Sequence, residues 1–119
     1  DTDSRLQELH FGDWENRCFA DLDQETVKRW SENFVQLAPP NGENFSQLCH
    51  RADAFWQDLL QEHASGQVII VTHAGVIRAL LANLLQMPPA QAFRLRVDNG
   101  SVHCLHHRDS YTSIQYINR

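Results

Sequence analysis

The chain of 119 residues has no long apolar run. Its longest unbroken apolar stretches, Val68–Val71 and Ala79–Ala82, are far shorter than the ~20 residues that a membrane-spanning helix needs. No segment has the layout of a secretion signal, and the chain begins Asp-Thr-Asp without a methionine. We therefore expect a single domain with no membrane partner, which is a mature product, a trimmed chain or a fragment.

The sequence also has few basic residues and few cysteines. Ten Lys and Arg stand against fifteen Asp and Glu, and the basic residues do not cluster, so we expect no nucleic-acid partner. The three cysteines have no paired spacing and no CxxC, which indicates reduced thiols and a cytoplasmic protein. In the tail, alternation along a strand puts only Cys104 and His106 on one face, too few for a structural zinc site, so we expect no metal.

Three segments have apolar residues at helical spacing. The first runs from Val27 to Leu37, with Asp21 or Asp23 as its N-cap. The second follows the Pro39-Pro40 loop, with Asn41 as a candidate cap, and ends near Ser65-Gly66. The third has its apolar positions between Val76 and Leu85 and ends before Pro88-Pro89. The large aromatic residues of the first two segments, Phe34, Phe45, Phe55 and Trp56, are predicted to be core.

The segment Gln67–Thr72 contains a continuous run of β-branched residues, which predicts a strand buried on both faces of a parallel sheet. Two weaker strands are expected at Gly100–His106 and Tyr111–Ile117, with a turn at Asp109-Ser110, and a further one at Arg5–Leu9. This order of elements indicates an α/β fold with a largely parallel sheet. So few strands leave that sheet incomplete, because a fully buried strand needs a neighbour on each side.

The stretch around His73 is the most informative for function. His73 lies where a predicted strand ends and a helix begins, the edge at which open α/β sheets bind ligands. The N–H groups of Ala74, Gly75 and Val76 would be unpaired there and would favour an anion. A histidine that merely ends a strand is equally consistent with the pattern. Arg78, one turn further, is either a phosphate clamp or, as we favour, part of a surface salt bridge.

A second cluster lies near Glu8. Glu8 and His10 are two residues apart, so they share a face if the segment is extended. An aromatic turn, Phe11–Trp14, follows, and a carboxyl group beside aromatic rings is suited to act as a general acid. The simpler alternative is an ordinary surface glutamate. Trp14 is either a substrate contact or a core residue.

Three separated motifs together resemble the histidine phosphatase superfamily, which includes cofactor-dependent phosphoglycerate mutase. The order and spacing match for Leu6-x-Glu8 before Gly12–Glu15, for Gly42-Glu43 before a helix containing Arg51, and for Val71–Gly75. The details are most similar to the α-ribazole phosphatases of cobalamin biosynthesis, on the segments Phe11–Glu15, Pro40–Glu43, Leu85–Pro88 and Phe93–Val97.

This resemblance implies a three-layer phosphoglycerate mutase-like fold and a phosphohistidine mechanism without metal or cofactor. Glu8 would be the acid and later the base, and His73 would stabilise charge on the transferring oxygens. The Ala74 N–H would add an oxyanion contact, while His10 and Trp14 would line the substrate pocket. Apart from the resemblance, Arg51 either contacts the ligand or, as we favour, pairs with a loop carboxylate. The expected substrate is a small-molecule phosphomonoester, best α-ribazole 5′-phosphate.

One departure from the family is serious. The nucleophile of the family lies in an Arg-His-Gly motif, and no such tripeptide occurs in the chain. We therefore expect residues 1–119 to be the C-terminal part of a histidine phosphatase domain, lacking the first strand and inactive alone. The alternatives are a mutase or broad-specificity phosphatase of the same fold, or a non-catalytic phosphate-binding remnant. An exposed sheet edge would favour a homodimer.

Overall fold

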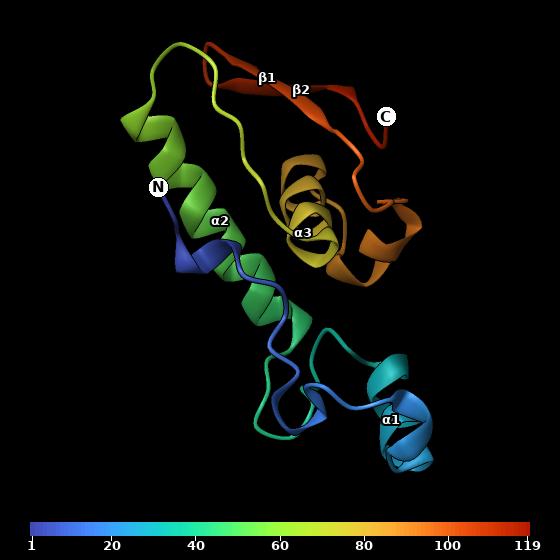
Figure 1. The fold of residues 1–119 in the computed structure, drawn as a ribbon. Coiled ribbons are helices and arrows are strands. Elements are labelled where there is room, and N and C mark those ends of the chain that lie inside the picture. The colour runs from blue at the N-terminus through green and yellow to red at the C-terminus, as the bar shows by residue number, and fades with distance from the viewer.

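The computed structural model describes all of residues 1–119 and contains three α-helices and one two-stranded sheet. The helices are α1 (Gln24–Glu32), α2 (Phe45–Glu62) and α3 (Ala74–Leu85), and the strands are β1 (Cys104–Arg108) and β2 (Tyr111–Tyr116). Short 3₁₀ helices lie at η1 (Ser4–Leu6), η2 (Gly12–Trp14), η3 (Phe19–Asp21) and η4 (Pro89–Arg94). Figure 1 shows α2 and α3 beside each other, with α1 set apart from them. No helix combines the length and the apolar character that crossing a membrane requires.

The predicted helices are confirmed, with changes at their ends. α1 begins after Asp23, one of the two expected caps, but it ends at Glu32, before the expected Leu37. The expected cap Asn41 of α2 is wrong. Asn44 takes that role, because its side chain accepts from the Gln47 N–H while the Gln47 side chain accepts from the Asn44 N–H. α3 ends at Leu85, and the following residue, Gln86, has a left-handed backbone conformation before Pro88.

The hairpin of β1 and β2 is also confirmed, although β1 runs from Cys104 to Arg108 and not from Gly100 to His106 as expected. The two strands are antiparallel, with Arg108 opposite Tyr111 and Leu105 opposite Ile114. Asp109 and Ser110 form the turn and both have positive φ angles, 54° and 63°. Two consecutive residues with positive φ match the twist of the strands that they join, which is why this short polar turn closes the hairpin.

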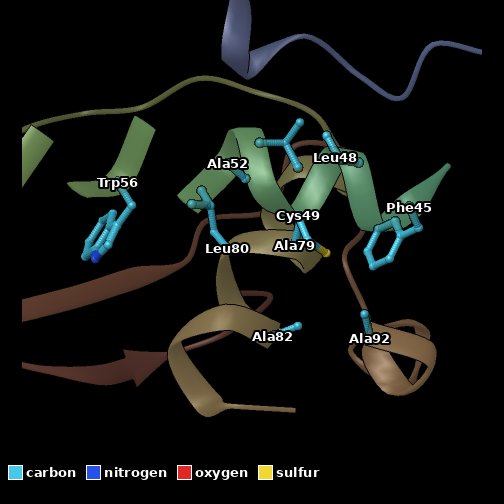
Figure 2. Packing of buried hydrophobic residues seen from close by; sticks show 10 residues of the cluster. Phe45, Leu48, Cys49, Ala52, Trp56, Ala79, Leu80, Ala82 and Ala92 are labelled. Atoms are coloured by element: carbon cyan, nitrogen blue, oxygen red, sulfur yellow. The ribbon is translucent and has the colours of Figure 1, made fainter. Parts of the chain in front are cut away.

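The core lies where α2, α3 and η4 meet (Figure 2). Phe45, Leu48 and Trp56 of α2 are buried with small residues of α3, which let the two helices come close. The ten buried residues of this cluster are Phe45, Leu48, Cys49, Ala52, Trp56, Val76, Ala79, Leu80, Ala82 and Ala92. The predicted core positions Phe45, Phe55 and Trp56 are thus confirmed, and Phe34 packs against the cluster from its edge.

The expected strand at Gln67–Thr72 is wrong. In Figure 1 this segment is the extended run between α2 and α3, and none of its backbone groups makes a hydrogen bond to another part of the chain. Ile69 is 90% exposed and Val71 is 87% exposed. The physical reason is that a strand needs a partner, and residues 1–119 place none beside this segment. The expected strand at Arg5–Leu9 is wrong too, because Ser4–Leu6 forms η1.

The single sheet is therefore antiparallel and two-stranded, accompanied by helices. The predicted parallel, three-layer arrangement is not seen in residues 1–119, since its central strand finds no neighbour. It stays a prediction for a whole domain. The predicted incompleteness of the sheet agrees with the exposed apolar face of Gln67–Thr72.

Candidate functional site

The two predicted site segments meet at the start of α3. His73 is the N-cap residue of that helix and is exposed, and the Thr72 hydroxyl anchors this point by donating to the Leu6 carbonyl at 2.6 Å. The Glu8 carboxylate lies at the same place. Its Oε2 accepts a hydrogen bond from the Gly75 N–H at 3.1 Å, and its Oε1 accepts one from the Leu9 N–H at 2.9 Å.

The anion predicted for this helix start is thus supplied by the chain itself. Helix N-termini favour negative charge because their first N–H groups lack intrahelical partners and the helix dipole is positive there. The Glu8 carboxylate takes the Gly75 N–H, while the N–H groups of Ala74 and Val76 donate to no group of the chain. Two unused donors therefore remain beside Glu8 and His73, aligned with the start of the helix.

Gly75 is needed for this contact, a role that sequence reasoning did not assign to it. We predicted that the Ala-Gly pair would let a ligand approach. In the structure, a Cβ atom on Gly75 would overlap Glu8 Oε1. The glycine therefore makes room for the catalytic candidate Glu8, and no local sequence signal relates these two positions.

The Glu8 segment has no regular secondary structure and is held by two side chains. The Arg51 guanidinium pairs with the Glu43 carboxylate, Nε to Oε2 at 2.8 Å and Nη2 to Oε1 at 2.9 Å. It also donates to the carbonyls of Arg5 and Glu8, at 2.7 and 3.1 Å. The predicted pairing of Arg51 with a loop carboxylate is confirmed.

The surroundings of the Glu43 carboxyl group lower its pKa. Burial acts to raise the pKa of its carboxyl group, but hydrogen bonds from Arg51 and the His10 N–H act in the opposite direction and prevail. The pKa of Glu43 therefore lies below its ordinary value of 4.5, so the carboxylate stays charged beside Arg51 at neutral pH.

His10 and Trp14 occupy different surroundings. The His10 side chain is exposed, and its Nδ1 accepts from the Gly12 N–H at 3.2 Å. Trp14 is buried and meets Trp30 and Phe19 edge to face, with ring centroids 5.5 and 6.2 Å apart. This supports the core alternative for Trp14, and its contact with substrate stays a prediction.

A small cavity of about 120 Å³ adjoins the site. Its lining includes Glu8, Phe11, Ala74, Gly75 and Arg78. The predicted salt bridge of Arg78 is wrong, because Arg78 forms no ion pair. It donates through Nε to the Leu95 carbonyl at 3.0 Å, and its guanidinium lies 4.9 Å from the centre of the Phe93 ring.

A larger cavity, about 620 Å³, lies elsewhere, between α2, α3 and the hairpin. It contains none of the predicted site residues. It is lined by Asp53, Trp56, Gln57, Leu60, Gln61, Leu80, Asn83, Leu84, Gln86, His107, Ser110, Tyr111 and Thr112. No predicted catalytic group reaches it, so we place the candidate site at the start of α3.

Comparison with known protein families decides the relationship. The family model described as "Histidine phosphatase superfamily (branch 1)" matches residues 1–119, the whole chain. The chain belongs to this superfamily. Within it, the adenosylcobalamin/α-ribazole phosphatase of Salmonella typhimurium is 32% identical over 116 residues, which is 95% of the chain and 57% of that relative.

Solved structures of two phosphatases have a similar fold over the part that this chain covers. The α-ribazole phosphatase from Shigella flexneri superposes with a TM-score of 0.88 at 30% identity, covering 98% of this chain and 59% of that one. A mycobacterial glucosyl-3-phosphoglycerate phosphatase, solved with inorganic phosphate, gives a TM-score of 0.80 at 27% identity, covering 98% and 63%. The chain thus spans less than two thirds of the length of these relatives.

Proposed function

We propose that residues 1–119 supply the acid and the second histidine of a histidine phosphatase site that hydrolyses phosphomonoesters. The observation that carries this proposal is the position of the Glu8 carboxylate at the start of α3, directly after His73. This contact joins two motifs that lie 67 residues apart in the sequence. Membership of the superfamily supports the same reaction class.

The proposed reaction has two displacements. A histidine nitrogen attacks phosphorus, the bond from phosphorus to the ester oxygen breaks, and Glu8 gives its proton to that leaving oxygen. Water then attacks the phosphohistidine, passes a proton to Glu8, and the phosphorus–nitrogen bond breaks to release phosphate. The Arg-His-Gly motif that carries this nucleophile in the family is absent from residues 1–119, so we propose that they are inactive alone.

His73 and the Ala74 N–H would stabilise the transferring group. In the transition state, negative charge is spread over the phosphoryl oxygens, and fixed donors aimed at those oxygens lower the barrier. The Ala74 N–H has no partner in the chain, and the helix dipole adds positive potential at the same point. His10, exposed two residues after Glu8, is the proposed contact to the rest of the substrate. The buried Trp14 is a second proposed contact.

The proposed substrate is α-ribazole 5′-phosphate, a small molecule of cobalamin biosynthesis. The relatives named α-ribazole phosphatase, at 30 to 32% identity, support this choice. Glycolytic mutase activity and broad-specificity phosphatase activity are the alternatives on the same fold. A phosphate-binding domain without catalysis is the alternative from a different class.

We further propose that residues 1–119 form the C-terminal part of one domain of a cytoplasmic protein. The chain carries three cysteines, none in a disulfide, which suits a reducing compartment. The net charge of −5 supports a small-molecule partner over nucleic acid. The exposed apolar segment Gln67–Thr72 supports pairing of two copies.

The test is release of inorganic phosphate, measured for the 119-residue chain and for the gene product that contains it. We expect no turnover by the 119-residue chain and hydrolysis of α-ribazole 5′-phosphate by an active product. Glu8→Gln should lower kcat by ~10²–10⁴-fold because it removes a general acid. His73→Ala should also lower kcat, while Glu62→Gln, at the exposed end of α2, serves as the matched control.

Three other outcomes would contradict this proposal. Return of the phosphoryl group to a phosphoglycerate, without net release, would indicate a mutase. Full activity of Glu8→Gln would remove Glu8 from the mechanism. Binding of phosphate or vanadate without turnover by the complete gene product would support the non-catalytic alternative.

A further inference from the structure

The segment that carries Glu8 owes its position to contacts made by α2 and the loop before it. Residues 7–10 form neither helix nor strand, so no hydrogen-bond ladder fixes them. The Arg51 guanidinium binds the Arg5 carbonyl at 2.7 Å and the Glu8 carbonyl at 3.1 Å. The first of these carbonyls lies within η1 and the second lies two residues after its end, and one rigid planar group holds both.

Glu43 holds the other end of the same segment. Its Oε1 accepts from the His10 N–H at 3.1 Å, and its own N–H donates to the His10 carbonyl at 2.8 Å. Arg51 contacts both oxygens of this carboxylate, so the two side chains act as one unit. Gly42 allows the close approach, because a Cβ atom there would lie 2.7 Å from the His10 carbonyl oxygen.

Partial burial and bidentate hydrogen bonding hold the Arg51–Glu43 pair in one geometry. The side chains of Arg51 and Glu43 are 22% and 16% exposed, and the pair is bidentate. By contrast, the ion pair of Arg5 with Asp58 involves a carboxylate that is 55% exposed, and its guanidinium contacts neither Glu8 nor His10. The Arg51 side chain thus binds the backbone at Glu8, whereas the Arg5 side chain contacts neither Glu8 nor His10.

We propose that Arg51 and Glu43 are positioning residues for the Glu8 carboxyl group. Between them they fix the backbone at residue 8 and at residue 10. With that backbone set, the Glu8 side chain reaches the Gly75 N–H at the start of α3. A general acid must lie within hydrogen-bond reach of the leaving oxygen, and a misplacement of about 1 Å can cost ~10²-fold in rate. The inference rests on the proposed function only where it names Glu8 as the acid.

The position of Glu8 can be tested without turnover, by amide hydrogen exchange of the 119-residue chain followed by NMR. The Gly75 N–H reports its hydrogen bond to Glu8, and the Leu81 N–H, in the buried part of α3, reports the stability of that helix. The variants are Arg51→Gln, Arg51→Lys and Glu43→Gln, and Arg5→Gln is the matched control. Arg51→Lys and Glu43→Gln keep part of the contacts and serve if Arg51→Gln does not fold.

We expect exchange at Gly75 to become at least ~10-fold faster in Arg51→Gln and Glu43→Gln, with Leu81 unchanged, because only the local hydrogen bond is lost. Arg51→Lys should recover part of the protection, and Arg5→Gln should leave Gly75 as it is. Unchanged exchange at Gly75 in both variants would overturn the proposal. An equal increase at Gly75 and Leu81 would also overturn it, since the pair would then only stabilise the whole fold.

A kinetic measurement on the phosphate-releasing protein separates this inference from the proposed function. There, Arg51→Lys should lower kcat with little change in KM. In a Glu8→Gln background, Arg51→Lys should lower kcat no further. An additional loss in that background would show that Arg51 acts apart from Glu8. If no phosphatase activity exists but Gly75 exchange responds as expected, the proposed function fails and the positioning of Glu8 stands.

Discussion

The Glu8 carboxylate accepts a hydrogen bond from the Gly75 N–H across 67 residues of sequence, at 3.1 Å. Because Gly75 lacks a side chain, Glu8 Oε1 occupies the space that a Cβ atom would take. A segment without regular secondary structure and a helix start are thereby joined at one point. The size of one residue in α3 consequently determines where the carboxyl group of another segment lies.

Gly75→Ala should therefore displace Glu8 while sparing the helix. Alanine is favoured over glycine within a helix by roughly 0.5–1 kcal/mol, which offsets part of the local crowding. We expect little change in the free energy of unfolding but a fall in kcat of about 10- to 100-fold in the phosphate-releasing protein, as for a misplaced catalytic group. In a Glu8→Gln background the same substitution should lower kcat by a much smaller factor. Equal losses in both backgrounds would show that Gly75 acts on something other than Glu8.

Local sequence patterns predicted the helices and the hairpin because the forces that form them are local. Apolar spacing marks α1, α2 and α3, and the Asp109-Ser110 turn closes the hairpin with its own backbone angles. The segment Gln67–Thr72 shows where prediction from local sequence patterns fails. Its composition describes a buried strand, yet burial and pairing depend on a neighbour that residues 1–119 do not provide.

The candidate site likewise combines residues that sequence motifs predicted with a contact that they did not predict. Glu8, His73 and the Arg51–Glu43 pair follow from motifs that can be recognised along the chain. The contact of Glu8 with Gly75 could not be predicted, because it depends on how a segment without regular structure crosses a helix start. The expected salt bridge of Arg78 failed for a related reason, since a backbone carbonyl and an aromatic ring replaced the carboxylate.

Gly12 should be the glycine whose replacement costs most stability. Its φ angle is +57°, and a Cβ atom would overlap the Pro40 carbonyl oxygen, which accepts from the Asp13 N–H in the same turn. Gly66 is the matched control, because its φ angle is +99° but nothing lies within 4 Å of its added Cβ. Both alanine variants should lose about 1–3 kcal/mol from backbone strain, and Gly12→Ala should lose more through the overlap. Urea denaturation with equal m-values would measure both, and a smaller loss for Gly12→Ala would contradict this account.

Acid should weaken the fold partly through Glu43. Its pKa in the folded chain lies below the ordinary value of 4.5, so its contribution to stability is full above pH 4.5 and is lost as pH falls through the lower, folded pKa. Glu43→Gln removes that titration. The difference in free energy of unfolding between the parent chain and Glu43→Gln should therefore shrink as pH falls from 6 towards 3. A difference that stays constant over this range would show that the carboxylate of Glu43 is not preferentially charged in the fold.

The cysteines should differ in reactivity according to burial. Burial raises the pKa of the Cys49 thiol to about 11, and this residue belongs to the core between α2 and α3, whereas Cys18 is exposed. Because the thiolate is the reactive form, iodoacetamide at pH 8 should modify Cys18 first and Cys49 only after unfolding. Intact mass and peptide mapping with and without urea would show this order. Labelling of Cys49 in the folded chain, in a Cys18→Ser variant, would contradict the buried position.

The segment Gln67–Thr72 should make the 119-residue chain self-associate. It combines unpaired backbone groups with Ile69 and Val71, which are 90% and 87% exposed, and it has no lysine or proline to discourage pairing. Ile69→Lys and Val71→Lys introduce a charge where the side chain faces solvent, so they should leave the monomer folded and reduce association. The exposed Leu37→Lys is the control for an added charge elsewhere. Sedimentation velocity over a range of concentrations measures the effect, and association that is equal in all three variants would show that copies meet through another surface.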